Sequence, residues 1–142
     1  MRQSPPATSP IQAILDRSAL LSYARGHLHV GELLVDIADE GAAMGVPAVA
    51  LLDAHIESLG DEHARALLGL LITLPGIAVL DLDARSAPPT ADVVPAAKGD
   101  LPRSHAVWAA REHEAYYLTT EPDRVRDLLP AGQIHTIPGQ DA

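Results

Sequence analysis

The sequence of 142 residues contains no cysteine, only one lysine, and no long uninterrupted apolar run. The absence of cysteine excludes disulfide bonds and fits a reducing compartment. The longest apolar run, residues 66–74, is broken by Gly69 and Thr73 and is too short to span a bilayer. Residues 1–10 are polar and contain three prolines, unlike the apolar segment of a signal peptide. We therefore expect a cytoplasmic protein with no membrane contact.

Basic residues are also scarce, since 10 lysine and arginine residues stand against 19 acidic residues, for a net charge of −9. This balance opposes nucleic-acid binding by bulk electrostatics, because phosphates are neutralised by lysine and arginine. An acidic balance aids solubility. Two more specific interpretations stay open, namely acid concentrated in a cation site and an acidic surface bound by a basic protein. No Gly-x-x-x-x-Gly-Lys motif is present, so nucleotide triphosphatase chemistry has no support.

The length suits one domain, which we place at residues 11–138, between a flexible tail at 1–10 and a short tail at 139–142. Apolar periodicity and turn residues predict strands at residues 11–15, 46–52, 77–82, 115–120 and 133–137. Amphipathic patterns, caps and glycines predict helices at residues 17–24, 31–44, 53–59, 62–74, 91–98, 101–113 and 121–129. This alternation predicts an α/β fold with a mostly parallel sheet of about five strands and helices on both faces.

Several acidic residues fall at or just after the predicted strand ends. They are Asp16, Asp53, Asp83 and Glu121. Ligands of parallel α/β sheets bind beyond the carboxyl ends of the strands. The sequence therefore directs attention to this edge of the sheet.

Four segments together resemble the PIN-domain family. They are residues 14–21, an apolar strand followed by Asp and a small-residue helix start; 46–54, ending in Asp; 104–113, an alanine-rich helix; and 117–123, a closing strand and turn. They follow the family's order and spacing over residues 11–138. The resemblance implies a three-layer α/β/α domain. The family includes the VapC-type toxins of toxin–antitoxin pairs, which are magnesium-dependent endoribonucleases.

The resemblance also implies a carboxylate site that holds Mg²⁺ or Mn²⁺, which are hard cations that prefer oxygen ligands. Asp16 matches the first acid, Asp53 replaces the family's glutamate, and Glu121 matches the fourth acid, with Asp123 as an alternative. The third acid is missing, because Arg103 or Ser104 stands there.

Asp100 lies one helical turn before the position of the missing acid, where it also suits a helix cap. The predicted metal ligands are therefore Asp16, Asp53, Asp100 and Glu121, of which Asp16, Asp53 and Glu121 are the predicted catalytic residues. The metal would activate water for attack on a phosphodiester. An arginine at the third position could instead occupy the place of the cation.

Two functions follow from these residues. The first is a metal-dependent endoribonuclease, acting on RNA as the toxin of a toxin–antitoxin pair and binding an antitoxin-like protein. The second is a degenerate PIN-like domain that binds a protein partner without cleaving RNA. A homodimer through the apolar helix at 67–72 is compatible with both, although the same residues suit a buried core.

Other residues near the predicted site have more ordinary interpretations beside functional ones. His55 and His105 could orient a phosphate or transfer a proton, but each also suits a polar position at the end of an element. Trp108, the only tryptophan, could stack a base, but core packing or a protein interface explains it as well.

Overall fold

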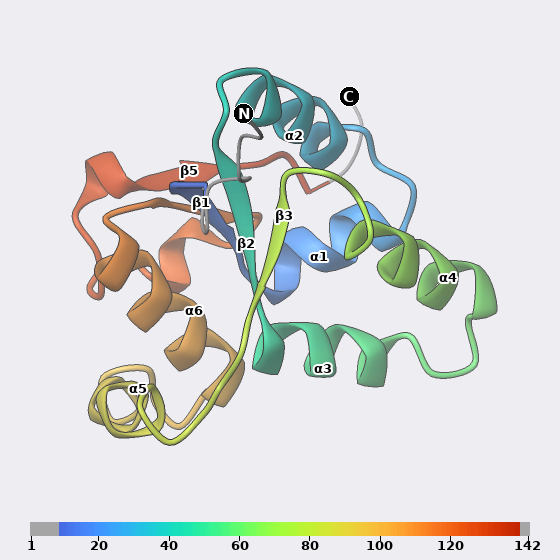
Figure 1. The fold of residues 1–142 in the computed structure, drawn as a ribbon. Coiled ribbons are helices and arrows are strands. Elements are labelled where there is room, and N and C mark those ends of the chain that lie inside the picture. Colours follow the sequence, from blue (N-terminus) through green and yellow to red (C-terminus); the bar gives the residue numbers. More distant parts are fainter. Residues whose placement is uncertain (1–8, 140–142) are drawn as a thin grey trace.

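The computed structural model describes residues 9–139, so the predicted tails at 1–10 and 139–142 lie almost wholly outside the described residues. Five parallel strands form one sheet in the order β3-β2-β1-β4-β5 (Figure 1). They are β1 (Ile11–Leu15), β2 (Ala43–Pro47), β3 (Ile77–Leu80), β4 (Tyr116–Thr119) and β5 (Ile134–Thr136). The predicted α/β class and parallel sheet are confirmed.

Six α-helices and two short 3₁₀ helices connect the strands in the described part of the chain. They are α1 (Arg17–Ala24), α2 (His29–Asp39), α3 (Ala48–Glu57), α4 (Glu62–Leu71), α5 (Ala87–Val93), α6 (Leu101–His113), η1 (Pro122–Arg124) and η2 (Ala131–Gln133). Among residues 9–139, none of these helices has the length and apolar character needed to cross a lipid bilayer.

The sheet separates two hydrophobic clusters, because successive side chains of a strand point to opposite faces. In β1, Ala13 and Leu15 pack into the cluster that includes residues of α1 to α4, whereas Ile14 packs into the cluster of α5 and α6. In β4, Leu118 and Tyr117 divide between the clusters in the same way. Figure 1 shows α5 and α6 on one side of the sheet and α1 and α4 on the other. The result is the three-layer arrangement expected from the sequence.

The predicted helix at 31–44 is too long. Helix α2 ends at Asp39, and Gly41 takes a φ of +76°, a conformation that glycine adopts without strain. Met44 therefore lies in β2 rather than on the apolar face of the helix. Because β2 begins early and ends at Pro47, the segment predicted as strand 46–52 lies mostly in α3. A short apolar run fits either structure by periodicity alone.

Two further predicted helices differ from the structure. The segment 121–129 forms only the 3₁₀ helix η1 and turns, although Val125, Leu128 and Leu129 are buried as a helix would bury them. The helix predicted at 91–98 is instead α5, which begins at Ala87. Prolines fit the first turn of a helix, where no amide donor is needed, so the proline-rich segment starts the helix early.

Candidate functional site

Asp16 lies where β1 ends and α1 begins, and its side chain caps α1. Its Oδ1 accepts hydrogen bonds from the Ala19 amide at 2.9 Å and from the Ser18 hydroxyl at 2.6 Å. The residue is only 6% exposed. Burial raises the pKa of Asp16 above its ordinary value, although the hydrogen bonds from Ser18, Thr119 and Ala19 act in the opposite direction. The ionised form of Asp16 is therefore costly for the fold in this position.

Ser18 joins the ends of β1 and β4, which are neighbouring strands. Its hydroxyl oxygen accepts a hydrogen bond from the Thr120 amide at 2.9 Å and lies 3.2 Å from the Thr119 hydroxyl. The Glu121 amide donates to the Thr119 hydroxyl oxygen at 2.9 Å. This network fixes the turn after β4 and holds the carboxylate of Glu121 on the same side as Asp16.

Asp100 and Arg103 come from the start of α6. Asp100 caps this helix by accepting a hydrogen bond from the Arg103 amide at 2.9 Å. The guanidinium of Arg103 also forms an ion pair with the Asp100 carboxylate at 2.7 Å and lies 3.8 Å from the carboxylate of Glu121. Its side chain is only 13% exposed. The arginine therefore lies between two of the four carboxylates predicted to hold a metal.

Arg17 occupies a similar position on the opposite side of Glu121. Its guanidinium lies 3.2 Å from Asp53, 2.8 Å from Glu57 and 3.8 Å from Glu121. Burial acts to lower the pKa of Arg17, but the charges of these three carboxylates and of Asp100 raise it above its ordinary value overall. The sequence prediction missed both Arg17 and Glu57. The available signals were a basic residue next to Asp16 and a glutamate one helical turn after Asp53.

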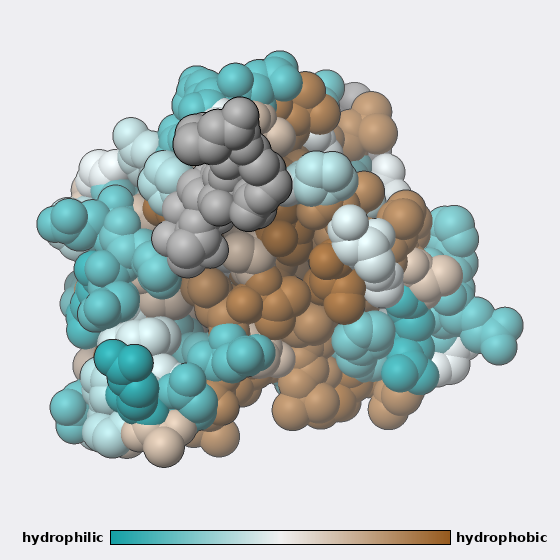
Figure 2. All heavy atoms as spheres, in the orientation of Figure 1, coloured by the Kyte–Doolittle hydropathy of each residue, from teal (hydrophilic) through white to brown (hydrophobic). Residues whose placement is uncertain are grey.

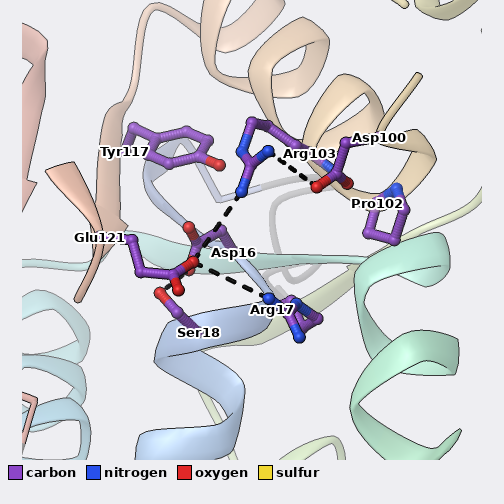
Figure 3. Close-up of a pocket in the computed structure, with 8 residues that line it drawn as sticks. All are labelled: Asp16, Arg17, Ser18, Asp100, Pro102, Arg103, Tyr117 and Glu121. Carbon is purple, nitrogen blue, oxygen red and sulfur yellow. Dashed lines mark hydrogen bonds and ion pairs between the residues drawn. The ribbon is translucent and has the colours of Figure 1, made fainter. Parts of the chain in front are cut away.

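These side chains surround a small cavity, shown in Figure 3. Its volume is about 10 Å³, which is room for about one water molecule. The lining residues are Asp16, Arg17, Ser18, Asp100, Pro102, Arg103, Tyr117 and Glu121.

The Tyr117 hydroxyl is buried in the wall of this cavity and has no partner at hydrogen-bond distance within the described chain, although it lies near enough to the Asp16 carboxylate to help lower the pKa of that group. Burial, together with the charge of Asp16, raises the pKa of Tyr117 well above its ordinary value. The hydroxyl therefore stays protonated and can donate to a group in the cavity.

Three of the four predicted metal ligands, Asp16, Asp100 and Glu121, line this cavity. Asp53 does not. It was expected to follow a strand, but it lies within α3 and reaches the site only through its ion pair with Arg17. Of the two residues that stand where the third acid is expected, Arg103 lines the cavity. Ser104 is buried, and its hydroxyl donates to the Asp100 carbonyl at 2.7 Å.

The other residues singled out from the sequence lie outside this cavity. Asp123 is 80% exposed and pairs with Arg126 on the surface. His55 accepts a hydrogen bond from Arg65 at 3.3 Å. His105 is fully buried and lies in a stacked arrangement with Trp108.

The donor set does not fit Mg²⁺ or Mn²⁺ as these side chains are arranged. Asp53, Asp100 and Glu121 already face guanidinium groups, and Oδ1 of Asp16 accepts two hydrogen bonds. In residues 9–139, no three His, Cys, Asp or Glu side chains are grouped so that they could hold a metal ion. A divalent cation would also meet two positive charges close by, which Coulomb repulsion opposes.

Comparison with known proteins gives a likeness of fold but no sequence match. No protein-family model and no curated protein matches the chain. The fold is similar to that of a chain in a toxin–antitoxin complex from Klebsiella pneumoniae. The TM-score is 0.62 at 12% sequence identity, over 88% of this chain and 97% of the other. At this identity the likeness concerns the fold alone.

Proposed function

We propose that this chain is a PIN-like domain that binds a protein partner, as a member of a toxin–antitoxin type of pair, without metal-dependent cleavage of RNA. The observation that carries the proposal is the placement of Arg17 and Arg103 among the carboxylates. The two guanidinium groups supply the positive charge that a metal would supply in an acidic site. The carboxylates that face the two arginines then form ion pairs within the chain instead of holding a catalytic ion; they are Asp53, Glu57, Asp100 and Glu121.

The fold and the charge of the chain support a partner of the antitoxin kind. The similar chain belongs to a toxin–antitoxin complex, and the PIN resemblance of residues 11–138 agrees with it. A net charge of −9 favours a basic protein over RNA, because RNA repels an acidic surface. The cytoplasmic location stays a prediction.

An exposed apolar face on α3 supports protein binding as well. Leu52 and Ile56 are one helical turn apart on α3 and are 59% and 52% exposed, and Leu59, in the turn just after α3, is 64% exposed. Contiguous apolar surface of this kind marks interaction sites more often than it marks ordinary surface. A partner that covers this face removes apolar surface from contact with water, which favours binding.

A homodimer through residues 67–72 is part of the same proposal, but only some of these residues are available. Leu68 and Leu71 are fully buried in the core, whereas Leu70 and Ile72 are exposed. The α3 face offers a second copy more apolar surface than this helix does.

A metal-dependent endoribonuclease is the second candidate function. It is favoured by the convergence of Asp16, Asp100 and Glu121 on one cavity, together with the Tyr117 hydroxyl that has no partner in the described chain. This function requires Arg17 and Arg103 to leave the cavity before an ion can enter. RNA is then the substrate.

Titration of the purified chain with Mn²⁺ by calorimetry separates the two functions. Wild type and Asp16→Asn are compared, since Asn keeps the side-chain oxygen that caps α1. We expect no saturable binding at millimolar Mn²⁺ in either protein. Saturable binding in the wild type that disappears in Asp16→Asn would refute the first proposal and establish a carboxylate metal site.

A further inference from the structure

A second and larger cavity lies beside the carboxyl end of β3, between the segment that leads into α5 and the face of α6. Its volume is about 520 Å³, within the range of small-ligand and side-chain pockets. Leu80 and Pro89 form part of its apolar wall, and Trp108 lies on the α6 side. It shares no lining residue with the cavity around Asp16.

Trp108 presents only part of its ring to this cavity. The ring of His105 lies against it, with the ring centres 5.9 Å apart and the planes 12° from parallel. His105 is fully buried, and burial lowers its pKa, although the nearby Asp81 acts in the opposite direction. The indole of Trp108 therefore has the His105 ring as a neighbour and also lines the cavity. The electrons of an indole ring attract a cation that lies over the face of the ring.

The charged groups of the cavity wall are mostly acidic. Asp81 and Glu112 are exposed, and neither forms an ion pair with another residue in the described part of the chain. Asp83 differs, because its carboxylate accepts hydrogen bonds from the Arg85 and Ser86 amides at 3.0 Å each. The carboxylate of Glu112 is thus available to a ligand, and that of Asp81 is exposed as well, although it also acts on the buried His105 imidazole. Arg85 opposes them, and His113 lines the same wall.

We propose that this cavity binds a cationic side chain, arginine in preference to lysine, carried by the protein partner of this chain. The inference rests on the proposed function and adds the chemistry of the partner. A guanidinium can stack on an indole while it donates hydrogen bonds to carboxylates, whereas an ammonium acts mainly as a point charge. A nucleic acid would bring phosphates next to Asp81 and Glu112, which like charges oppose.

The position of β3 agrees with a protein partner. The strand is at the edge of the sheet and pairs only with β2 among the described strands. An open edge is available to the backbone of an extended segment. Val79, which is 40% exposed, is on this strand and lines the cavity. Figure 2 shows apolar surface in the region of β3 and hydrophilic surface over α5, so a partner would meet both kinds beside one strand.

The single tryptophan gives a direct test, because its fluorescence reports only on this position. The full chain is titrated with blocked peptides of sequence Gly-Arg-Gly, Gly-Lys-Gly and Gly-Glu-Gly at low salt. We expect a saturable change with the arginine peptide, a change at least threefold weaker in affinity with the lysine peptide, and none with the glutamate peptide. Glu112→Gln should weaken the arginine response at least threefold, and Glu40→Gln, an exposed change just after the end of α2, should leave it unchanged.

Three results would overturn the inference. They are the absence of a saturable change with the arginine peptide, an equal response to the glutamate peptide, and a stronger response to a short RNA oligonucleotide than to any peptide. The Mn²⁺ titration concerns a cavity with different lining residues. Mn²⁺ binding in that cavity would refute the proposed function but would not change the peptide titration. Absence of a peptide response would refute this inference but would not change the Mn²⁺ titration.

Discussion

Arg17 and Asp53 form an ion pair, with the arginine Nε 3.2 Å from the aspartate Oδ2, that joins the first turn of α1 to the middle of α3. The pair explains why an acid of the predicted metal site does not line the cavity. Asp53 is held at the edge of the site by a cation that belongs to the chain itself. The same arginine contacts Glu57 and Glu121, so it neutralises one side of the site.

Replacing Arg103 by Ala should create affinity for Mn²⁺. The change frees Asp100 and Glu121 and removes a positive charge from the cavity. A unit charge about 5 Å from a divalent ion changes its energy by several kcal/mol at an effective dielectric of about 20, so binding should tighten by about tenfold or more. Calorimetric titration measures the change.

Arg126→Ala, which removes a surface arginine paired with Asp123, is the matched control and should bind Mn²⁺ no better than wild type. Equal Mn²⁺ affinities of wild type, Arg103→Ala and Arg126→Ala would mean that the Arg103 guanidinium does not occupy the position of a metal ion.

Replacing Asp16 by Asn should stabilise the fold at neutral pH. Burial raises the pKa of Asp16 in the folded state, so the folded protein keeps this proton to a higher pH than the unfolded chain does. The stability linked to the proton is complete below the ordinary carboxyl pKa and is lost as the pH rises through the folded value. Asn carries no charge and keeps an oxygen for the Ala19 amide.

Thermal unfolding followed over a range of pH tests this expectation. The melting temperature of Asp16→Asn should exceed that of wild type at neutral pH, and the difference should shrink as the medium becomes acidic. Asp92→Asn, an exposed change on α5, should show no such trend. A difference that grows toward acidic pH would contradict the assigned direction of the shift.

Replacing Ser18 by Ala should destabilise the fold by about 1–3 kcal/mol, because it leaves the half-buried Thr120 amide without its acceptor and removes the hydrogen bond to the buried Asp16. Denaturant unfolding at neutral pH measures the change. Ser22, on the same helix, is the matched control, since its buried hydroxyl has no hydrogen-bond partner in the described chain. Ser22→Ala should be neutral or slightly stabilising. Similar losses for both variants would show that Ser18 contributes no more than buried volume.

Replacing Gly45 by Ala should destabilise the sheet. A Cβ at this position in β2 would lie 2.8 Å from the Cδ1 atoms of Ile14 and Leu80, and overpacking of this kind costs about 1–3 kcal/mol. Gly69 in α4 meets nothing within 4 Å, so Gly69→Ala should stabilise the protein by about 0.5–1 kcal/mol. The free energies of unfolding of the two variants should therefore change in opposite directions. Stabilisation by Gly45→Ala would show that the neighbouring side chains can move aside.

The fold class could be predicted because strands and helices alternate in the chain and because caps such as Asp61 and Asp100 mark where helices begin. Boundaries were harder. Met44 was misplaced because α2 ends earlier than predicted, before Gly41, although a glycine there is a local signal for a helix end. Asp53 was misplaced because a short apolar run satisfies a strand and a buried helix equally well.

The candidate site was predicted in part. Asp16 and Glu121 follow neighbouring parallel strands, and topology alone brings them together. Arg17 was missed because its contacts are with α3 and with the end of β4, which are distant in sequence. Tyr117 was missed because an apolar strand gives no sign that one hydroxyl faces a polar cavity.

The pairing of β1 with β4 sets an order of events during synthesis. Asp16 leaves the ribosome early, but the strand that places Glu121 beside it is near the other end of the chain. Until β4 has emerged, Ser18 has no Thr120 amide to bind and the wall formed by Tyr117 is missing. Contacts between such distant segments form late, because the entropy of closing the intervening chain opposes them. A nascent chain therefore carries the elements of the apolar α3 face before it has a site at the strand ends.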